Sequence, residues 1–266
     1  AADGEWVAVS EDFLAVLEAA LQVGVDSGGA YDVTIAPLVD LWGFGPGKPV
    51  SEPPSDAAIT AAMAQLGQVR LQVDRERGAV LQPGGLRLDF SSLAKGYAID
   101  EAAAWLLDEG VDRFLLEVGG EMRLSGLSAR GDEWRVAIEL PQVAIRGVAS
   151  ALQLTDRAVA TSGDYRNYFE HYGKRYSHSI DPRTGQPVEH DLVSVTVVHD
   201  SAMLADAWAT ALLVLGTEGA RAVAQAQGLA VYFISRVGEG FVHASTPGIA
   251  PYLPQGGQAG NKGEAQ

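Results

Sequence analysis

Apolar residues recur every three or four positions in two segments near the start of the chain. The first segment begins at Ser10, a favourable helix N-cap, and its spacing predicts a helix that ends near Gly24. The second begins at Ser55 and predicts a shorter helix that ends at Gly67. Residues 27–54 between them are rich in Gly and Pro, which indicates a structured loop around a short apolar segment.

Farther along the chain, segments in which every second residue is apolar, as in strands, alternate with segments in which apolar residues have helical spacing. Residues 71–90 predict an antiparallel meander, and residues 92–109 predict a longer helix that leads into a buried strand at 114–118. Two further helices are expected at 201–215 and 218–227. The remaining strand candidates are 134–140, 147–152, 158–161, 165–171, 175–180, 193–198 and a final hairpin of 229–235 with 241–244.

Many strands with helices between them and few βαβ units favour an α+β fold, with largely antiparallel sheets and helices packed between and around them. The length of 266 residues suits one large domain or two closely joined lobes. We expect a single domain over residues 1–253. The Gly/Gln-rich end, 254–266, has no apolar anchor and is expected to be a disordered tail.

Charge and composition argue against several classes of protein. With 19 Lys+Arg against 34 Asp+Glu, the net charge is −15, which repels nucleic acid and anionic membrane surfaces. The chain has no Cys, which excludes thiolate metal sites, cysteine nucleophiles and disulfides. Its first ten residues have neither a basic nor an apolar leader segment, which is compatible with a cytoplasmic, a processed or a truncated chain.

The segment SAMLADAWATALLVLG, residues 201–216, reads as an apolar helix with two polar residues in its interior. Asp206 and Thr210 are four positions apart and therefore lie on one face, one turn apart. A buried carboxylate needs a cation, strong donors or a raised pKa. On the helix context alone, we favour a structural role in which the side chains of Asp206 and Thr210 hydrogen-bond to backbone groups. The alternative is that their oxygen atoms are ligands of Mg²⁺.

Two more segments could carry chemistry, and each also has a purely structural interpretation. In LDFSSLAKGYAID, residues 88–100, a strand runs into a helix start whose free amides would suit an anion. Alternatively, Ser91 or Ser92 is a simple N-cap and Lys95 is a solvated charge. YSHSIDPRTGQPV, residues 176–188, places His178 in a strand before a rigid turn, where it is either an acid–base residue or a packed histidine.

Two glycine-containing segments include further residues that could contact a ligand. Gly119 and Gly120 allow a ligand to approach the backbone closely, or they simply form a turn. The segment 160–168, which contains Ser162, either lines a ligand or is a turn. The pattern G-x-G-x-x-G is absent, so a Rossmann dinucleotide site is not indicated.

Taken together and in order, these segments resemble the ApbE family, the FAD:protein FMN transferases. GGAYDVTIAPLVDLWGFGP and LDFSSLAKGYAID are similar to two signatures of that family. LLEVGGEMRLSG, ATSGDYRNYF, YSHSIDPRTGQPV and ADAWATAL are similar to later blocks in the same order. The resemblance runs from about residue 9 to 247 and implies an ApbE-like, T-fold-like architecture.

The resemblance also implies roles for individual residues. Asp206 and Thr210 would bind Mg²⁺ together with the backbone carbonyl of Ala94, and His178 would be the catalytic residue. The residues expected to line the FAD site are Ala30, Tyr31, Asp32, Ser91, Lys95, Tyr97, Gly119, Gly120, Ser162 and Ile180. Among them, Lys95 would support the anionic groups of FAD.

The implied reaction is phosphoryl transfer, in which a Ser or Thr hydroxyl of a partner flavoprotein attacks the FMN phosphate of FAD and AMP leaves. A Mg²⁺-dependent FAD pyrophosphatase and a non-catalytic FAD-binding protein remain alternatives, although Asp206, Thr210 and His178 favour an enzyme. The family resemblance implies a periplasmic or extracytoplasmic location, with a possible lipid anchor outside this chain. Family members normally carry an N-terminal segment with flavin contacts, and we expect this chain to begin after it.

Overall fold

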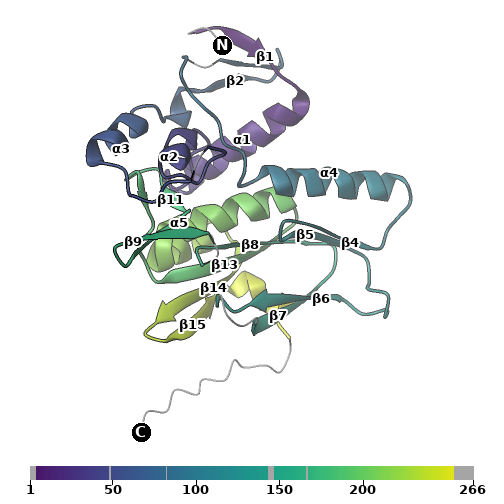
Figure 1. Ribbon diagram of the computed structural model, residues 1–266. Coiled ribbons are helices and arrows are strands. Elements are labelled where there is room, and N and C mark those ends of the chain that lie inside the picture. The colour runs from purple at the N-terminus through teal and green to yellow at the C-terminus, as the bar shows by residue number, and fades with distance from the viewer. Residues whose placement is uncertain (1–3, 48, 82, 143–146, 166, 255–266) are drawn as a thin grey trace.

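The centre of the molecule is a six-stranded antiparallel sheet in the order β15-β14-β13-β8-β5-β4 (Figure 1). The computed structural model describes residues 4–47, 49–81, 83–142, 147–165 and 167–254. The strands of the central sheet are β4 (Phe114–Val118), β5 (Glu121–Ser125), β8 (Ala158–Gly163), β13 (Leu192–His199), β14 (Ala230–Val237) and β15 (Gly240–Ser245).

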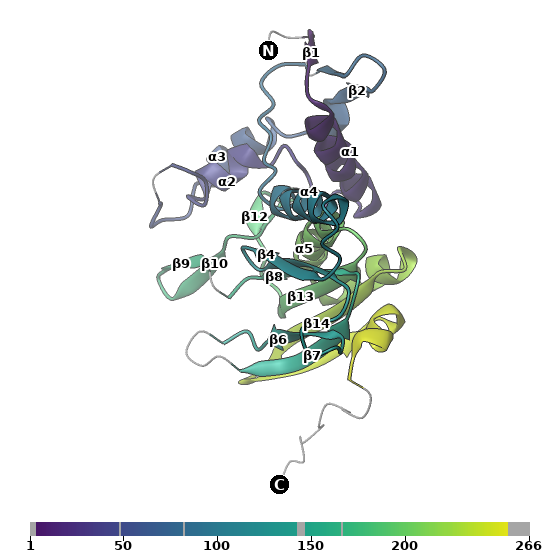
Figure 2. The ribbon, with the colours of Figure 1, turned by 90° about the vertical axis from the view of Figure 1, so that its right-hand side faces the viewer.

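Both faces of this sheet are covered (Figure 2). Helix α5 (Ala202–Ala226) packs on one face, and α1 (Glu11–Asp26) and α4 (Ala94–Asp108) pack on α5. The hairpin of β6 (Trp134–Glu139) and β7 (Val148–Leu154) closes the other face around a second apolar cluster. The helices and sheets therefore form successive layers, and α5 is buried in the middle.

Most of the remaining elements lie on the helical side of the sheet, whereas the 3-10 helix η2 (Pro247–Tyr252) packs against β14 and β7 on the other side. A small sheet of order β1-β3-β2 lies beside α1, and two short hairpins follow β8. The elements on the helical side are β1 (Trp6–Ala8), α2 (Ala36–Leu41), α3 (Asp56–Met63), η1 (Gln68–Arg70), β2 (Gln72–Asp74), β3 (Ala79–Leu81), β9 (Tyr168–His171), β10 (Lys174–Ser177), β11 (Ile180–Asp181) and β12 (Gln186–Pro187). Within the described ranges, no helix has the length and hydropathy needed to cross a bilayer.

Two contacts fix α4 against α5. Gly96 is buried, and a Cβ atom at this position would lie only 2.2 Å from the carbonyl oxygen of Ala202, so only glycine allows the two helices to cross this closely. Four residues later, the Asp100 carboxylate accepts hydrogen bonds from the Ser201 hydroxyl at 2.7 Å and from the Ala202 and Met203 amides at 2.9 and 3.0 Å. Helix α4 thereby caps the N-terminus of α5.

The predicted α+β class and most predicted elements are confirmed by this architecture. The Ser10 and Ser55 caps accept hydrogen bonds from the amides of Phe13 and Ala58, as expected. The two helices predicted after residue 200 form α5, which is interrupted at Gly216, where φ is 70°. The expected tail lies outside the described residues, apart from residue 254.

Three local predictions were wrong. Residues 86–90 form no strand, because their backbone meets the loop after α1 rather than a partner strand. Neither Ser91 nor Ser92 caps α4, because the Phe90 carbonyl already accepts the Leu93 and Ala94 amides in a turn. His178 lies in a bend, because β10 ends at residue 177 and the chain then turns away to pair β11 with β12.

We predict that Gly96→Ala lowers the free energy of unfolding by about 1–3 kcal/mol, because the added methyl group overlaps the backbone of α5, and this cost exceeds the gain in helix propensity. Urea unfolding followed by circular dichroism measures the change. Ala98→Ser, on the exposed side of α4, is the control and should change stability by about 0.5 kcal/mol or less. A Gly96→Ala protein as stable as the parent would contradict the close crossing.

Candidate functional site

A cavity of about 470 Å³ lies between α5, the start of α4 and the ends of β5 and β8. Five segments that are far apart in the sequence form its wall, and the bend after β10 closes one side. Of the residues predicted from the sequence, the cavity wall brings together Ser91, Lys95, Gly119, Ser162, His178, Ile180, Asp206 and Thr210.

The charged centre of this cavity is a lysine shared by two carboxylates. The Lys95 ammonium lies 3.1 Å from Asp206 Oδ2 and 3.5 Å from Glu121 Oε1, and it donates to the Ser91 carbonyl at 2.9 Å. Asp206 and Glu121 are only 3% and 5% exposed. The sequence left a cation, strong donors or a raised pKa open for the buried Asp206, and the structure supplies a cation from within the chain.

Burial changes the proton affinity of both carboxylates. Burial and the nearby charge of Asp206 raise the pKa of Glu121 to about 7, against the opposing effect of Lys95. Burial also raises the pKa of Asp206, and the Lys95 ammonium opposes that shift. Each carboxylate disfavours the charge of the other, so additional positive charge at this centre would stabilise both ionised forms.

Sequence reasoning missed Glu121, which is the first residue of β5 directly after the two glycines. Its Oε2 atom is buried and has no hydrogen-bond partner among the described residues. The signal was a carboxylate next to a Gly-Gly turn within a strand pattern, but only the fold shows that this turn lies beside Lys95.

The polar groups around Asp206 suit a cation that prefers oxygen ligands. Thr210 lies one turn further along α5, and its hydroxyl is 3.2 Å from the Ser162 hydroxyl. Carboxylate and hydroxyl oxygens, together with the unpartnered Glu121 oxygen, fit Mg²⁺ better than a softer metal. The described residues contain no cluster of three or more His, Cys, Asp or Glu side chains that could hold a metal, so such an ion would need hydroxyl, carbonyl or substrate oxygens as well.

His178 faces the same cavity with a defined orientation. Its Nδ1 atom lies 3.1 Å from the Asn167 carbonyl oxygen. A carbonyl can only accept, so Nδ1 carries the proton and Nε2 is the free basic atom. Burial lowers the pKa of His178, although the Asn167 carbonyl opposes this. The Phe44 ring lies edge-on at 6.2 Å and restricts the imidazole.

The apolar side of the cavity comes from α2 and from the bend that holds His178. Ile35, Val39 and Phe44 line it together with Ile180, which is 3% exposed. Behind them, Trp42 stacks on Tyr176 at 5.6 Å and donates through Nε1 to the Gly185 carbonyl at 2.9 Å. This side can therefore accept a flat apolar ring system next to the charged centre.

Three residues predicted to contact FAD, Ala30, Tyr31 and Asp32, are not among those that line the cavity. Ala30 and Tyr31 are 2% and 4% exposed, and the Tyr31 hydroxyl accepts a hydrogen bond from Ser92 Oγ at 2.8 Å. The Asp32 carboxylate bonds to the Thr34 amide and hydroxyl within its own turn. Tyr31 and Asp32 thus shape the loop that supports the cavity, and their direct contacts with FAD remain predictions.

Three other predicted residues also lie outside the lining. Tyr97 donates to Asp12 Oδ1 at 2.7 Å and so ties α4 to α1. Ala94, at the start of α4, is exposed, and Gly120 lies in the turn before β5. Ala94 directly precedes Lys95, and the contact of its carbonyl with a metal stays a prediction.

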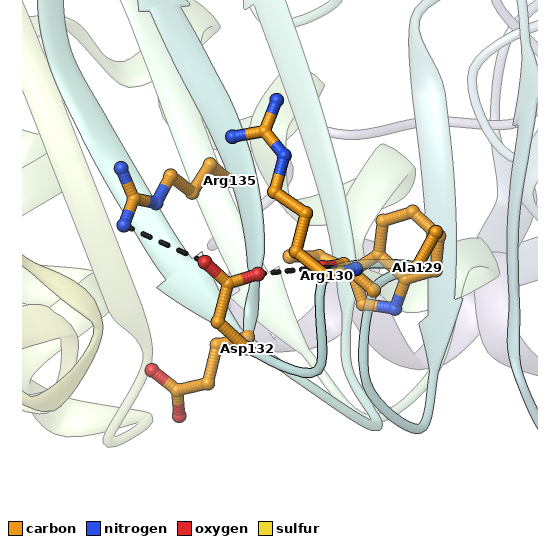
Figure 3. A pocket seen from close by; sticks show the side chains of 7 residues that line it. Ala129, Arg130, Asp132 and Arg135 are labelled. Atoms are coloured by element: carbon orange, nitrogen blue, oxygen red, sulfur yellow. Dashed lines mark hydrogen bonds and ion pairs between the residues drawn. The ribbon is translucent and has the colours of Figure 1, made fainter.

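A second hollow, of about 260 Å³, lies in the loop between β5 and β6 (Figure 3). Asp132 occupies its centre, where it accepts a hydrogen bond from Ser128 at 2.5 Å and lies 3.6 Å from Arg135. The Ser128 hydrogen bond is the main reason that the pKa of Asp132 is lowered. This hollow is formed by residues 128–135 alone and contains none of the predicted site residues.

Comparisons with known proteins agree with the geometry. Residues 1–233 match the model of the ApbE family. A protein of Salmonella typhimurium named FAD:protein FMN transferase is 44% identical over 248 residues, which cover 92% of this chain and 71% of that protein. The apo crystal structure of the Pseudomonas stutzeri flavinyl transferase ApbE is 41% identical, with a TM-score of 0.84 over 95% of this chain and 78% of that one. The ApbE protein of Thermotoga maritima, at 30% identity, also superposes with a TM-score of 0.84, covering 94% and 81% of the two chains.

We predict that His178 titrates below the usual histidine value of about 6.5, because burial disfavours the imidazolium. NMR titration of the His178 ring protons measures this midpoint directly. The same resonance in urea-unfolded protein is the reference and should titrate near 6.5. A midpoint in the folded protein at or above the unfolded one would contradict the buried, neutral imidazole.

Proposed function

The chain belongs to the ApbE family, and on that premise we propose that it is a Mg²⁺-dependent FAD:protein FMN transferase. In this proposal, the hydroxyl oxygen of a Ser or Thr on an acceptor flavoprotein attacks the FMN phosphorus of FAD. The bond to AMP breaks, AMP leaves, and FMN stays joined to the acceptor through a phosphoester. The hydroxyl proton passes to the protein.

One observation supports this function most strongly. A basic imidazole nitrogen and a buried charged centre line one cavity, which also has an apolar side. Phosphoryl transfer needs a proton acceptor at the attacking hydroxyl and positive charge near the phosphates. The apolar side, with Phe44 and Ile180, suits the flavin ring system.

His178 is the proposed proton acceptor. The Asn167 carbonyl holds the Nδ1 proton, so Nε2 remains free to take the hydroxyl proton. Burial lowers the pKa of His178, which favours the neutral imidazole. At saturating Mg²⁺ and FAD, the rate should fall as the pH drops through that lowered pKa.

The charged centre is the proposed phosphate side of the cavity. Asp206, Thr210 and the Ala94 carbonyl would hold Mg²⁺, which when bound supplies positive charge against the FAD phosphates and the leaving group. Ser91 and Ser162 line the same side and offer hydroxyl groups as donors to phosphate oxygens. Lys95 adds a further positive charge at this end.

The direct test is to incubate the protein with FAD, Mg²⁺ and an acceptor flavoprotein and to read the intact mass of the acceptor. We predict that the acceptor gains one FMN phosphoester, that AMP appears in equal amount, and that chelator stops both. In Asp206→Asn, which keeps the side-chain shape but loses the charge, Mg²⁺-dependent turnover should fall at least about tenfold.

Two outcomes would contradict this proposal. Release of free FMN and AMP with no change in the acceptor mass would indicate a pyrophosphatase, in which water takes the place of the protein hydroxyl. Unchanged, chelator-sensitive turnover by Asp206→Asn would show that the metal is held elsewhere.

We predict that His178→Ala binds FAD with an affinity within a few fold of the parent but transfers FMN at least about a hundredfold more slowly, because a positioned base typically contributes 10²–10⁴ in rate. Single-turnover transfer at saturating FAD measures the chemical step. His171→Ala is the control, since His171 does not line the cavity. A His178→Ala rate within a few fold of the parent would rule out the base, and a joint loss of stability and FAD affinity would indicate a packing role.

A further inference from the structure

We propose that Lys95 is an exchangeable counterion: it pairs with Asp206 and Glu121 while no metal is bound, and a divalent cation displaces it from both carboxylates. This inference rests on the proposed function for the identity of the metal. It assigns to Lys95 and Glu121 a role that the family resemblance does not supply.

Three oxygen atoms of the chain surround the Lys95 ammonium. An ammonium group has three N–H donors. The three acceptors around it are Asp206 Oδ2 at 3.1 Å, Glu121 Oε1 at 3.5 Å and the Ser91 carbonyl at 2.9 Å. In this position, the Lys95 charge is directed at the protein's own acidic groups.

When both carboxylates are ionised, the charge at this centre is incompletely balanced, because two buried carboxylates share one ammonium. Glu121 Oε2 is buried and has no hydrogen-bond partner in the part of the chain that the structure describes. A divalent cation at Asp206 would balance both negative charges and give the unpartnered oxygen a ligand. A cation at that point would also repel the ammonium, which favours displacement of Lys95 from the same carboxylates.

The surrounding structure gives the lysine space to leave. A Cβ atom at Gly119 would lie 3.2 Å from Lys95 Cδ and 3.3 Å from Glu121 Oε2, so a side chain at this position would crowd both. Gly119 also has a φ of +65°, which favours glycine. The Lys95 side chain is 37% exposed and lines the cavity, so the displaced ammonium would stay near the phosphate side of the site.

The opposing possibility is a permanent structural ion pair, with the metal bound only by oxygens that Lys95 does not touch. The two arrangements differ in what happens to metal affinity when the lysine charge is removed. Competition predicts tighter binding, whereas a structural ion pair predicts unchanged or weaker binding, because its loss disturbs Asp206.

The test is titration of the metal-free protein with Mn²⁺ in the absence of FAD, with free Mn²⁺ measured by electron paramagnetic resonance. We predict that Lys95→Met binds Mn²⁺ at least about tenfold more tightly and that Glu121→Gln binds it at least about tenfold more weakly. Lys174→Met is the matched control: it removes the same charge from a surface ion pair with Glu189 and should bind like the parent.

A second measurement uses the unmodified protein and therefore does not depend on the folding of a variant. Acylation of Lys95 by a small amine-reactive reagent, followed by peptide mass mapping, should increase several fold when Mg²⁺ is added, and acylation of Lys174 should not change. Four results would each overturn the proposal. Two concern the variants: a folded Lys95→Met that binds Mn²⁺ no more tightly than the parent, or a Glu121→Gln that binds it equally well. The others are a parent protein that does not bind Mn²⁺ at all, and acylation of Lys95 that does not change when Mg²⁺ is added. None of these readouts requires FMN transfer, so they separate this inference from the proposed function.

Discussion

The close crossing of α4 and α5 is the constraint on which the site depends. Gly96 lets the α5 backbone approach α4, and Asp100 caps the N-terminus of α5 with three hydrogen bonds. Lys95 is the residue next to Gly96, and Asp206 lies in the second turn of α5. The packing of two helices therefore determines the distance between an ammonium and a buried carboxylate.

That ion pair explains how an otherwise apolar helix can carry an acidic residue through the middle of the molecule. Asp206 is surrounded on α5 by small buried residues, and burial alone raises its pKa. Lys95 offsets part of this cost, and the turn before β5 brings Glu121 to the same ammonium. The result is an acidic centre that the chain itself neutralises in part, with one carboxylate oxygen unpartnered among the described residues, a combination that suits reversible binding of a cation.

The parts of the site that could be predicted from the sequence are those with a local pattern. The four-residue spacing of Asp206 and Thr210, and a histidine before a rigid turn, were visible without the fold. Glu121 and the Asn167 carbonyl were not, because their roles depend on contacts between segments that are distant in the sequence.

The class of fold could be predicted from the periodicity of apolar residues. The order of strands in the central sheet could not, because β13 pairs with β8 across two intervening hairpins. Tyr31 is a different case: the family resemblance places it at the ligand, the fold buries it beside Ser92, and its contact with FAD stays a prediction.

The most direct test of this account is a crystal structure of the protein soaked with Mn²⁺ and FAD, with anomalous scattering used to locate the metal. The account predicts a metal peak at Asp206 and Thr210, the FAD pyrophosphate beside it, the flavin against Ile180 and Phe44, and the Lys95 ammonium no longer in contact with Asp206. A metal peak away from Asp206, or FAD bound with its pyrophosphate outside this cavity, would contradict it.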